Sequence, residues 1–424
     1  MTLIEEILTK ENLNQAYLQV YRNKGSAGVD GVTVEELKAY LKENGAKLVL
    51  DIQTRRYQPK PVRRVEIPKD NGKVRQLGIP TVVDRVIQQA VSQVLTPIYE
   101  QQFSDSSYGF RPGSSCEMAI IKSLEIINDG YEWVVDIDLE RFFDTVNHDR
   151  LIQIIFRTVK DGDVMSLISK YLKSGVMNQD KYEETEIGTP QGGNLSPLLS
   201  NIMLNELDKE LEARGLRFVR YADDCNIYVK SEKAANRVMT SITTFIEKKL
   251  GLIVNASKSK IGKPTDIKFL GFGYYYDTKA KGYQVKPHEK SVRKFKQKIK
   301  ALTKRSWGVD LDKRLLKLKQ LITGWVNYFR IARMIRIVRE IDMKVRNAIR
   351  VIIWKQWKVP QKQIPSLVKL GIDFEQAKGL TWCRRGYQYI AHSHIVKRAI
   401  SNTRLEKRGL VSARVHYLKV YTVI

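Results

Sequence analysis

The stretch Arg220-Tyr221-Ala222-Asp223-Asp224-Cys225 places two adjacent acids between two short apolar runs, Phe218-Val219 before them and Ile227-Tyr228-Val229 after them. Strand-forming residues on both sides of a polar break predict a β-hairpin with the carboxylates at its bend. Neighbouring carboxylates repel each other and raise each other's pKa unless a cation neutralises them. The pair therefore indicates a divalent-metal site, whereas two solvated Asp in a turn are the commoner explanation when the stretch is taken alone.

A second acidic strand is predicted over residues 133–139, which read Trp-Val-Val-Asp-Ile-Asp-Leu and are rich in β-branched side chains. Side chains alternate along a strand, so Asp136 and Asp138 share one face. If this strand and the acidic hairpin belong to one sheet, Asp138 and Asp223 converge. Two such carboxylates can hold two Mg²⁺ ions about 4 Å apart, an arrangement suited to nucleotidyl transfer. Spacing alone does not choose between Asp136 and Asp138.

The composition is that of a folded intracellular protein. With 424 residues and 43% hydrophobic content, the chain has room for roughly three domains of about 150 residues. Three scattered cysteines, Cys116, Cys225 and Cys383, and five histidines spell out neither a disulfide framework nor a structural zinc site. The start of the sequence lacks the pattern of a signal peptide, and no apolar run approaches the about 18 residues of a membrane helix. We expect a cytoplasmic protein without a membrane partner.

The positive charge is concentrated in the last third of the sequence. Residues 281–424 hold 35 Lys and Arg against 8 Asp and Glu, whereas residues 1–280 hold 38 of each sign. This asymmetry accounts for the whole net charge of +27 and predicts a polyanionic partner, nucleic acid rather than membrane. A solvated basic face that serves solubility is the alternative.

Cations for a triphosphate are available on a second predicted hairpin. Val65-Glu66-Ile67-Pro68 and Gln76-Leu77-Gly78-Ile79 flank an Asn71-Gly72 pair, which is typical of a tight turn. Lys69 and Arg75 near its tip would supply a point charge and a bidentate fork. Cations at hairpin tips are more often simply solvated.

Two further features could contact a nucleotide. Phe143 follows Asp138 by five residues, and an aromatic ring there could block a ribose 2′ hydroxyl or could equally pack in the core. The loop 188–197 contains Gln191 and a Gly192-Gly193 pair that permits close approach to a backbone. We expect Ser196 to be the N-cap of the helix that follows, with proline at its first position. As a plain turn the loop is unremarkable.

The remaining sequence is mostly helical by its apolar spacing. Helices are predicted at about 2–21 and 82–102, and three basic helices follow from about residue 286, over 311–330 and over 335–357, giving a basic bundle. We expect Pro360 and Pro365 to mark a linker, and the basic, aromatic residues beyond it to form a small domain.

Taken together, these motifs resemble the bacterial group II intron reverse transcriptases, also called maturases. The resemblance runs nearly the full length and rests on motifs in the family's order: Asn23 to Gly31; Arg75 to Thr81 with Asp84-Arg85; Tyr108 to Pro112; Asp138 to Asp144; Thr189 to Pro197; Tyr221 to Asp224; Lys258-Ser259-Lys260 with Phe269 to Phe272; and Gly324 to Phe329 in the basic helices.

The resemblance implies an α+β right-hand polymerase. Its parts would be fingers (1–115), a palm with an antiparallel sheet and interleaved fingers elements (116–285), a helical thumb or maturase domain (286–360) and a basic DNA-binding domain (361–424).

The family's site residues carry over to this sequence by motif. Asp138, Asp223 and Asp224 would be the catalytic acids that ligate two Mg²⁺ ions, with Mn²⁺ as a substitute. Phe143 would be the steric gate for dNTPs, and Lys69, Arg75 and Gln191 would contact the nucleotide. Because side chains alternate along a strand, we expect Asp223 rather than Asp224 to bind metal directly beside Asp138.

The family's biology implies the partners. They would be an intron RNA, an RNA template with a DNA primer, target DNA and dNTPs, with splicing assistance and retrohoming as the biological roles. The Cys pairs of the HNH nuclease that ends some members do not occur, which suggests the shorter class. Two alternatives stay open: a domesticated defence or repair reverse transcriptase, and a splicing cofactor without polymerase activity.

Overall fold

A computed structural model describes residues 1–68, 72, 74–178, 181–184, 187–188 and 192–422. The chain divides into two compact units, Met1–Lys263 and Pro264–Ile424. Both units contain helices and antiparallel strands, so the predicted α+β fold class is confirmed. Within the described residues, no helix combines the length and the apolar character needed to cross a bilayer. The finer division into fingers, palm, thumb and DNA-binding domain stays a prediction.

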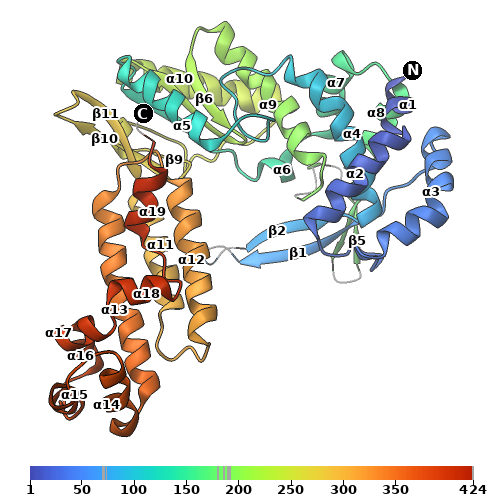
Figure 1. The fold of residues 1–424 in the computed structure, drawn as a ribbon. Coiled ribbons are helices and arrows are strands. Elements are labelled where there is room, and N and C mark those ends of the chain that lie inside the picture. Colours follow the sequence, from blue (N-terminus) through green and yellow to red (C-terminus); the bar gives the residue numbers. More distant parts are fainter. Residues whose placement is uncertain (69–71, 73, 179–180, 185–186, 189–191, 423–424) are drawn as a thin grey trace. The chain divides into compact units, whose positions relative to one another are not determined.

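The first unit is built on a four-stranded antiparallel sheet of order β6-β7-β3-β8. Its central strand is the predicted acidic strand, β3 (Trp133–Ile137), whose β-branched residues Val134, Val135 and Ile137 are buried. The hairpin of β6 (Arg217–Tyr221) and β7 (Asp224–Val229) lies on one side of β3, and β8 (Lys260–Gly262) lies on the other. Helix α10 (Glu232–Phe245) packs on this sheet, and α5 (Cys116–Asn128) contacts β6 (Figure 1).

A second sheet of the same unit has the order β2-β1-β4-β5. The predicted hairpin is confirmed as β1 (Val62–Pro68) and β2 (Val74–Ile79), and its tip lies outside the described residues. Strand β4 (Val176–Asn178) runs parallel to β1 and pairs with β5 (Lys181–Glu183).

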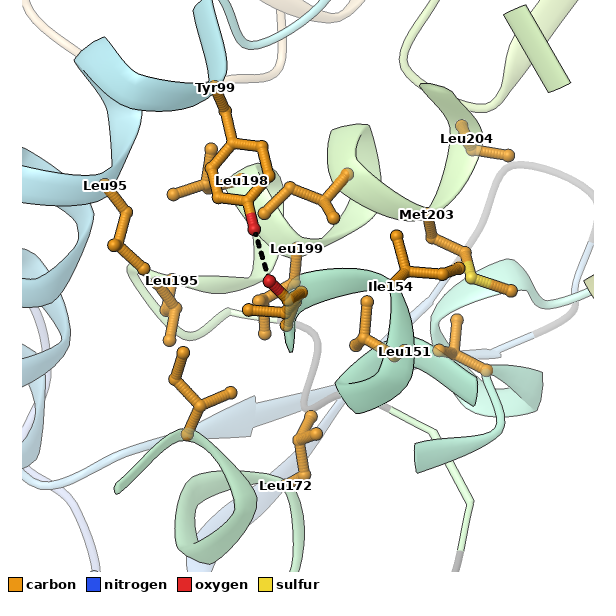
Figure 2. Packing of buried hydrophobic residues seen from close by; sticks show 14 of the residues in the cluster. Leu95, Tyr99, Leu151, Ile154, Leu172, Leu195, Leu198, Leu199, Met203 and Leu204 are labelled. Atoms are coloured by element: carbon orange, nitrogen blue, oxygen red, sulfur yellow. Dashed lines mark hydrogen bonds between the residues drawn. The ribbon is translucent and has the colours of Figure 1, made fainter. Parts of the chain in front are cut away.

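The core of the first unit is formed where helices from distant parts of the sequence meet. Figure 2 shows Leu95 and Tyr99 of α4 (Val82–Glu100) facing residues of α7 (His148–Thr158) and α9 (Ser196–Ala213). The Tyr99 hydroxyl donates a hydrogen bond to the Ile155 carbonyl at 3.2 Å, which satisfies a polar group inside an apolar cluster. This packing fixes α9 next to the central sheet.

The other elements of the first unit connect these layers. The helix expected over 2–21 is interrupted at Thr9, which caps a new helix by accepting from Asn12 N. The remaining bounds are α1 (Leu3–Ile7), α2 (Lys10–Asn23), α3 (Leu37–Gln53), α6 (Phe142–Thr145), α8 (Gly162–Leu172) and a π-helical turn over Ile246–Leu250.

The second unit joins a three-stranded sheet to a helical bundle. Strands β9 (Lys268–Phe269), β10 (Phe272–Asp277) and β11 (Gly282–Pro287) are antiparallel. The predicted basic helices are α11 (Glu289–Leu302), α12 (Leu311–Tyr328) and α13 (Ile335–Trp357). The last helix, α19 (Ala413–Val420), packs against both α12 and α13 (Figure 1).

Two local predictions were wrong. Pro360 and Pro365 do not mark a linker, because both lie in α14 (Pro360–Lys369), where Pro360 occupies the first turn and needs no backbone donor. Ser196 is not an N-cap but the first residue of α9, whose N-cap is Leu195 without a side-chain hydrogen bond. The short helices α15 (Phe374–Thr381), α16 (Tyr387–His392), α17 (His394–Ala399) and α18 (Asn402–Lys407) complete the unit.

Candidate active site

The candidate acids lie at one end of β3 and β7. In the antiparallel ladder Asp136 pairs with Asn226 and Ile137 with Cys225, so one step further Asp138 comes opposite Asp224. Residues directly opposite each other on antiparallel strands project to the same face. Asp136, Asp138 and Asp224 therefore share a face of the sheet.

The other acid, Asp223, belongs to the turn between β6 and β7. Tyr221 pairs with Asp224 across the hairpin, which leaves a two-residue turn made of Ala222 and Asp223. Ala222 has a φ of 56°, a left-handed conformation that favours glycine in hairpin turns. The alternation that favoured Asp223 over Asp224 applies only within a strand, so the ranking of these two acids stays a prediction.

A buried arginine fixes this turn. Arg220 and Asp208 have fully buried side chains, and Arg220 Nε donates to Asp208 Oδ1 at 2.7 Å. The same guanidinium donates through Nη1 to the Ala222 carbonyl at 2.9 Å and to Asn201 Oδ1 at 3.0 Å. Because Asp208 and Asn201 lie on α9, this network ties the turn to a helix of the core. A bidentate guanidinium–carboxylate pair restricts both partners to one geometry.

A glycine supports the turn from the other side. A Cβ added to Gly109 would lie 2.1 Å from Ala222 N, so no larger residue fits. The Gly109 carbonyl accepts from Asn201 Nδ2 at 2.8 Å, and Tyr108 N donates to the Arg220 carbonyl at 2.9 Å. The Tyr108-Gly109-Phe110 stretch therefore holds the acidic turn in place, a role that its sequence alone did not predict.

Asp138 is held by a segment that follows the sheet. Lys258 Nζ lies 2.9 Å from Asp138 Oδ1 and 3.2 Å from Oδ2. The Asp138 backbone N–H donates to Ser259 Oγ at 3.0 Å, and its carbonyl accepts from Asn255 N at 2.9 Å. In the sequence, Lys258 and Ser259 stand out only as part of a family motif. No local pattern indicates that Lys258 contacts Asp138, which lies 120 residues earlier.

The acids lie close enough to affect one another electrostatically. The pKa of Asp136 is raised to about 6, mainly by burial and also by the charges of Asp224 and Asp138, against the opposing effect of Lys260. Among the described residues, no three or more His, Cys, Asp or Glu side chains already form a metal-binding group. The donor chemistry nevertheless fits a hard divalent cation, because carboxylate oxygens are its preferred ligands. Asp138, Asp223 and Asp224 are the residues that would hold it.

The predicted nucleotide contacts are only partly visible. Lys69 and Gln191 lie outside the described residues. Arg75 pairs with Ile67 in the β1–β2 ladder, and for it only the backbone is described. Phe143 is half-buried and packs against the hydrophobic core, with its ring 5.2 Å from that of Phe142. Core packing is thus one part of its role, and the sugar gate stays a prediction.

The glycines of the 188–197 loop lie close to the protein's own backbone. Gly192 has a φ of 120°, and a Cβ there would lie 2.6 Å from the Gly78 carbonyl of β2. Gly188 has a φ of 93°, donates to the Val146 carbonyl at 2.8 Å and leaves no room for a side chain beside Asp144. Gly188 therefore lies against α6, and Gly192 lies against the strand that carries Arg75.

Comparisons with known proteins agree with these motifs. Residues 67–274 match the family model described as reverse transcriptase, RNA-dependent DNA polymerase. Residues 292–366 match the model of the group II intron maturase-specific domain. The two matches cover the acidic sheet and the basic helices, respectively.

Similar proteins come from bacteria and yeast, and the likeness covers parts of each chain. "Protein YkfC" of Escherichia coli K12 is 35% identical over 304 residues, which cover 62% of this chain and 80% of that protein. "Group II intron-encoded protein LtrA" of Lactococcus lactis subsp. cremoris is 42% identical over 206 residues, covering 48% of this chain and 34% of LtrA. The "Putative COX1/OXI3 intron 2 protein" of Saccharomyces cerevisiae is 31% identical over 335 residues, covering 64% of this chain and 38% of that protein.

Proposed function

This chain belongs to the RNA-directed DNA polymerases that carry a group II intron maturase domain, and we propose that it extends a DNA primer along an RNA template by two-metal nucleotidyl transfer from dNTPs. The observation that carries this proposal is the β3–β7 register, which brings Asp138 opposite Asp224 next to the turn that holds Asp223. All three acids lie in the region that matches the reverse transcriptases.

The acids would hold the metal from two strands of one rigid sheet. Asp138 follows β3, and Asp223 and Asp224 come from the hairpin that Arg220 and Gly109 fix. Two Mg²⁺ ions bound there would activate the primer 3′ hydroxyl and neutralise charge on the leaving pyrophosphate. Lys258 contacts the Asp138 carboxylate directly, and Lys69, Arg75 and Gln191 would bind the triphosphate.

The second unit would bind the RNA partners. Its residues 292–366 match the maturase-specific domain, and its excess of Lys and Arg suits the phosphates of an intron RNA or of a template–primer duplex. We extend the proposal to splicing assistance and retrohoming into target DNA. The three cysteines are all free thiols, which supports a cytoplasmic site of action.

Primer extension tests the polymerase. The full chain should extend a labelled DNA primer annealed to an RNA template when dNTPs and Mg²⁺ are supplied, and a chelator should abolish the product. The matched control is Asp138→Asn, which preserves the shape of the side chain but weakens the metal ligand. Absence of any product from the wild-type chain would contradict the polymerase and favour a role in RNA binding alone.

A further inference from the structure

The second unit contains a polar cavity of about 560 Å³ between α13 and the segment from α16 to α18. Helix α13 lines one wall with Met343, Arg346, Asn347 and Arg350, whose spacing places them on one helical face. Lys397 and Asn402 lie on the opposite wall. The cavity belongs to the second unit, whereas the acidic sheet belongs to the first.

Arg350 carries a buried charge into this cavity. Its side chain is buried, with 5% of the residue exposed, and its Nε donates to the Ile400 carbonyl at 3.0 Å while Nη2 donates to Asn402 Oδ1 at 2.9 Å. Both acceptors are neutral, and no carboxylate in the described part of the chain pairs with Arg350. Burying a guanidinium without a counter-charge is costly, so an anion beside it would be stabilising.

The neighbouring charges are also mainly positive. Arg346 lies one turn before Arg350 and donates to Glu406 Oε1 at 3.1 Å. Asp342, which lies 3.9 Å from Arg346, is already occupied by donors from Ser412 and Ala413. Lys397 is exposed and has no ion-pair partner within the described residues. Burial and the nearby charge of Arg346 lower the pKa of Arg350, as expected where positive charge is undercompensated.

Apart from Met343, the remaining lining supplies hydrogen-bonding groups. Ser401, Asn402 and Thr403 present hydroxyl and amide groups, and His392 Nε2 lies 3.1 Å from Asn347 Nδ2. Guanidinium groups match the oxygens of a phosphate bidentately, and a lysine adds a point charge. A phosphate placed among them could accept hydrogen bonds from these groups, which an apolar ligand could not do.

We propose that this cavity binds a phosphate group of a nucleic acid strand. The site deepens the proposed RNA binding of the second unit and rests on it for the class of ligand. It does not involve the polymerase acids, so its binding can be measured without catalysis.

The test compares two double variants of the full chain that remove the same charge. Arg346→Gln with Lys397→Gln changes the cavity, and Lys369→Gln with Lys378→Gln changes two exposed lysines outside its lining. Affinity is measured by fluorescence anisotropy with labelled single-stranded RNA and DNA oligonucleotides at one salt concentration. The cavity variant should bind about tenfold more weakly than the control variant, because charge-assisted hydrogen bonds are lost. Equal affinities would overturn the proposal.

A single substitution covers the case in which the Arg346 change disturbs folding. Lys397 is exposed and has no partner in the described structure, so Lys397→Gln should fold normally. It should weaken binding several-fold compared with Lys369→Gln, and no difference between them would reject the site.

The source of the phosphate is resolved by competition. A loss of affinity for RNA, for DNA or for both supports the site and identifies the strand. If inorganic phosphate or a nucleoside monophosphate protects the wild-type chain from unfolding but the oligonucleotide affinities of the variants are equal, the nucleic acid proposal fails. If the cavity variant binds more weakly than the control but the wild-type chain extends no primer, the phosphate site is supported and the polymerase proposal fails. If the wild-type chain extends a primer but the two variants bind equally, the polymerase proposal is supported and the phosphate site fails.

Discussion

The two units differ in their balance of charge and in how their most deeply buried arginine is paired. The first unit contains 36 Lys and Arg against 36 Asp and Glu, and the second contains 37 against 10. In the first, the fully buried Arg220 is neutralised by Asp208, whereas the less deeply buried Arg85 donates to the Ser26 carbonyl. In the second, the buried Arg314 and Arg350 donate to backbone carbonyls and an amide.

This difference matches what each unit is proposed to do. A site that positions acids needs a rigid surround, and a buried guanidinium–carboxylate pair fixes the hairpin that carries two of them. A surface that binds a polyanion benefits when its own carboxylates do not neutralise its cations. The second unit thus keeps positive charge even where it is buried.

The largest expected effect separates catalysis from binding. Asp223→Ala should reduce primer extension by at least about a hundredfold, because a metal ligand is lost, while affinity for RNA stays near the wild-type value. Single-turnover extension and filter binding measure the two. An equal loss of both would mean that the first unit has misfolded. The same pair of measurements on Asp224→Ala would rank the two acids.

Replacing the buried arginines tests the comparison directly. Arg220→Met leaves Asp208 buried and unpaired and should cost about 3–5 kcal/mol of unfolding free energy. Arg350→Met removes a charge bound only to neutral acceptors and should cost less, about 1–3 kcal/mol. Denaturant unfolding monitored by hydrogen exchange in each unit measures both. Adding Asp208→Leu to Arg220→Met should recover part of the stability, and similar costs for the two single variants would refute the contrast.

Added salt should weaken the binding of RNA by the second unit but should hardly change the rate of primer extension. Each phosphate contact on a single strand contributes a slope of about −0.7 in a plot of log affinity against log salt. Three contacts would therefore lower RNA affinity roughly tenfold when salt rises about threefold. Extension at saturating template and primer should change far less. A flat binding curve would remove the electrostatic role of the second unit.

The sugar gate should produce a smaller change. Phe143→Val should raise rNTP incorporation relative to dNTP incorporation several-fold, since a pocket distinguishes small groups by steric fit. Phe142→Val is the control, because Phe142 is buried next to Phe143 and tests the loss of packing alone. Unchanged sugar selectivity in the Phe143 variant would leave only the packing role.

The smallest expected effect concerns the carboxyl group of Asp136, near the end of β3. The pKa of Asp136 is raised to about 6 from an ordinary value of 3.8, so the folded state loses stability as the pH rises through this interval. Without divalent cations, Asp136→Asn should raise the melting temperature by a few degrees at neutral pH and leave it unchanged near pH 4, where the carboxyl is protonated. Thermal scans at both pH values test this sign.

Features set by local periodicity could be predicted from the sequence. The acidic hairpin was expected between Phe218 and Val229 and forms there, because strand-forming residues flank a short polar break. Helix α13 was expected over 335–357 and has these bounds, because its apolar residues keep one helical spacing. The helix over Pro360 and Pro365 was missed because proline usually ends helices, although at the first position it does not.

Tertiary partners of the site could not be predicted. Arg220 pairs with Asp208 only because β6 folds beside α9, and Gly109 reaches Ala222 from more than a hundred residues earlier in the sequence. Which acids lie opposite each other depends on the β3–β7 register, and the sequence of one strand does not specify that register. Sequence identified the reactive residues, but the groups that hold them depend on contacts between distant segments.

The return of α19 to the bundle has a consequence for synthesis on the ribosome. The buried Asp342 receives hydrogen bonds from Ser412 Oγ at 2.6 Å and from Ala413 N at 2.7 Å, about seventy residues after it. Until those residues leave the exit tunnel, α12 and α13 lack the packing of α19, and Asp342 lacks these two donors. The first unit ends at Lys263, so all of its residues are made before the second unit and it can fold while the second is still being made. A nascent chain paused before residue 412 should therefore carry a folded acidic sheet and an unfinished, chaperone-accessible basic bundle.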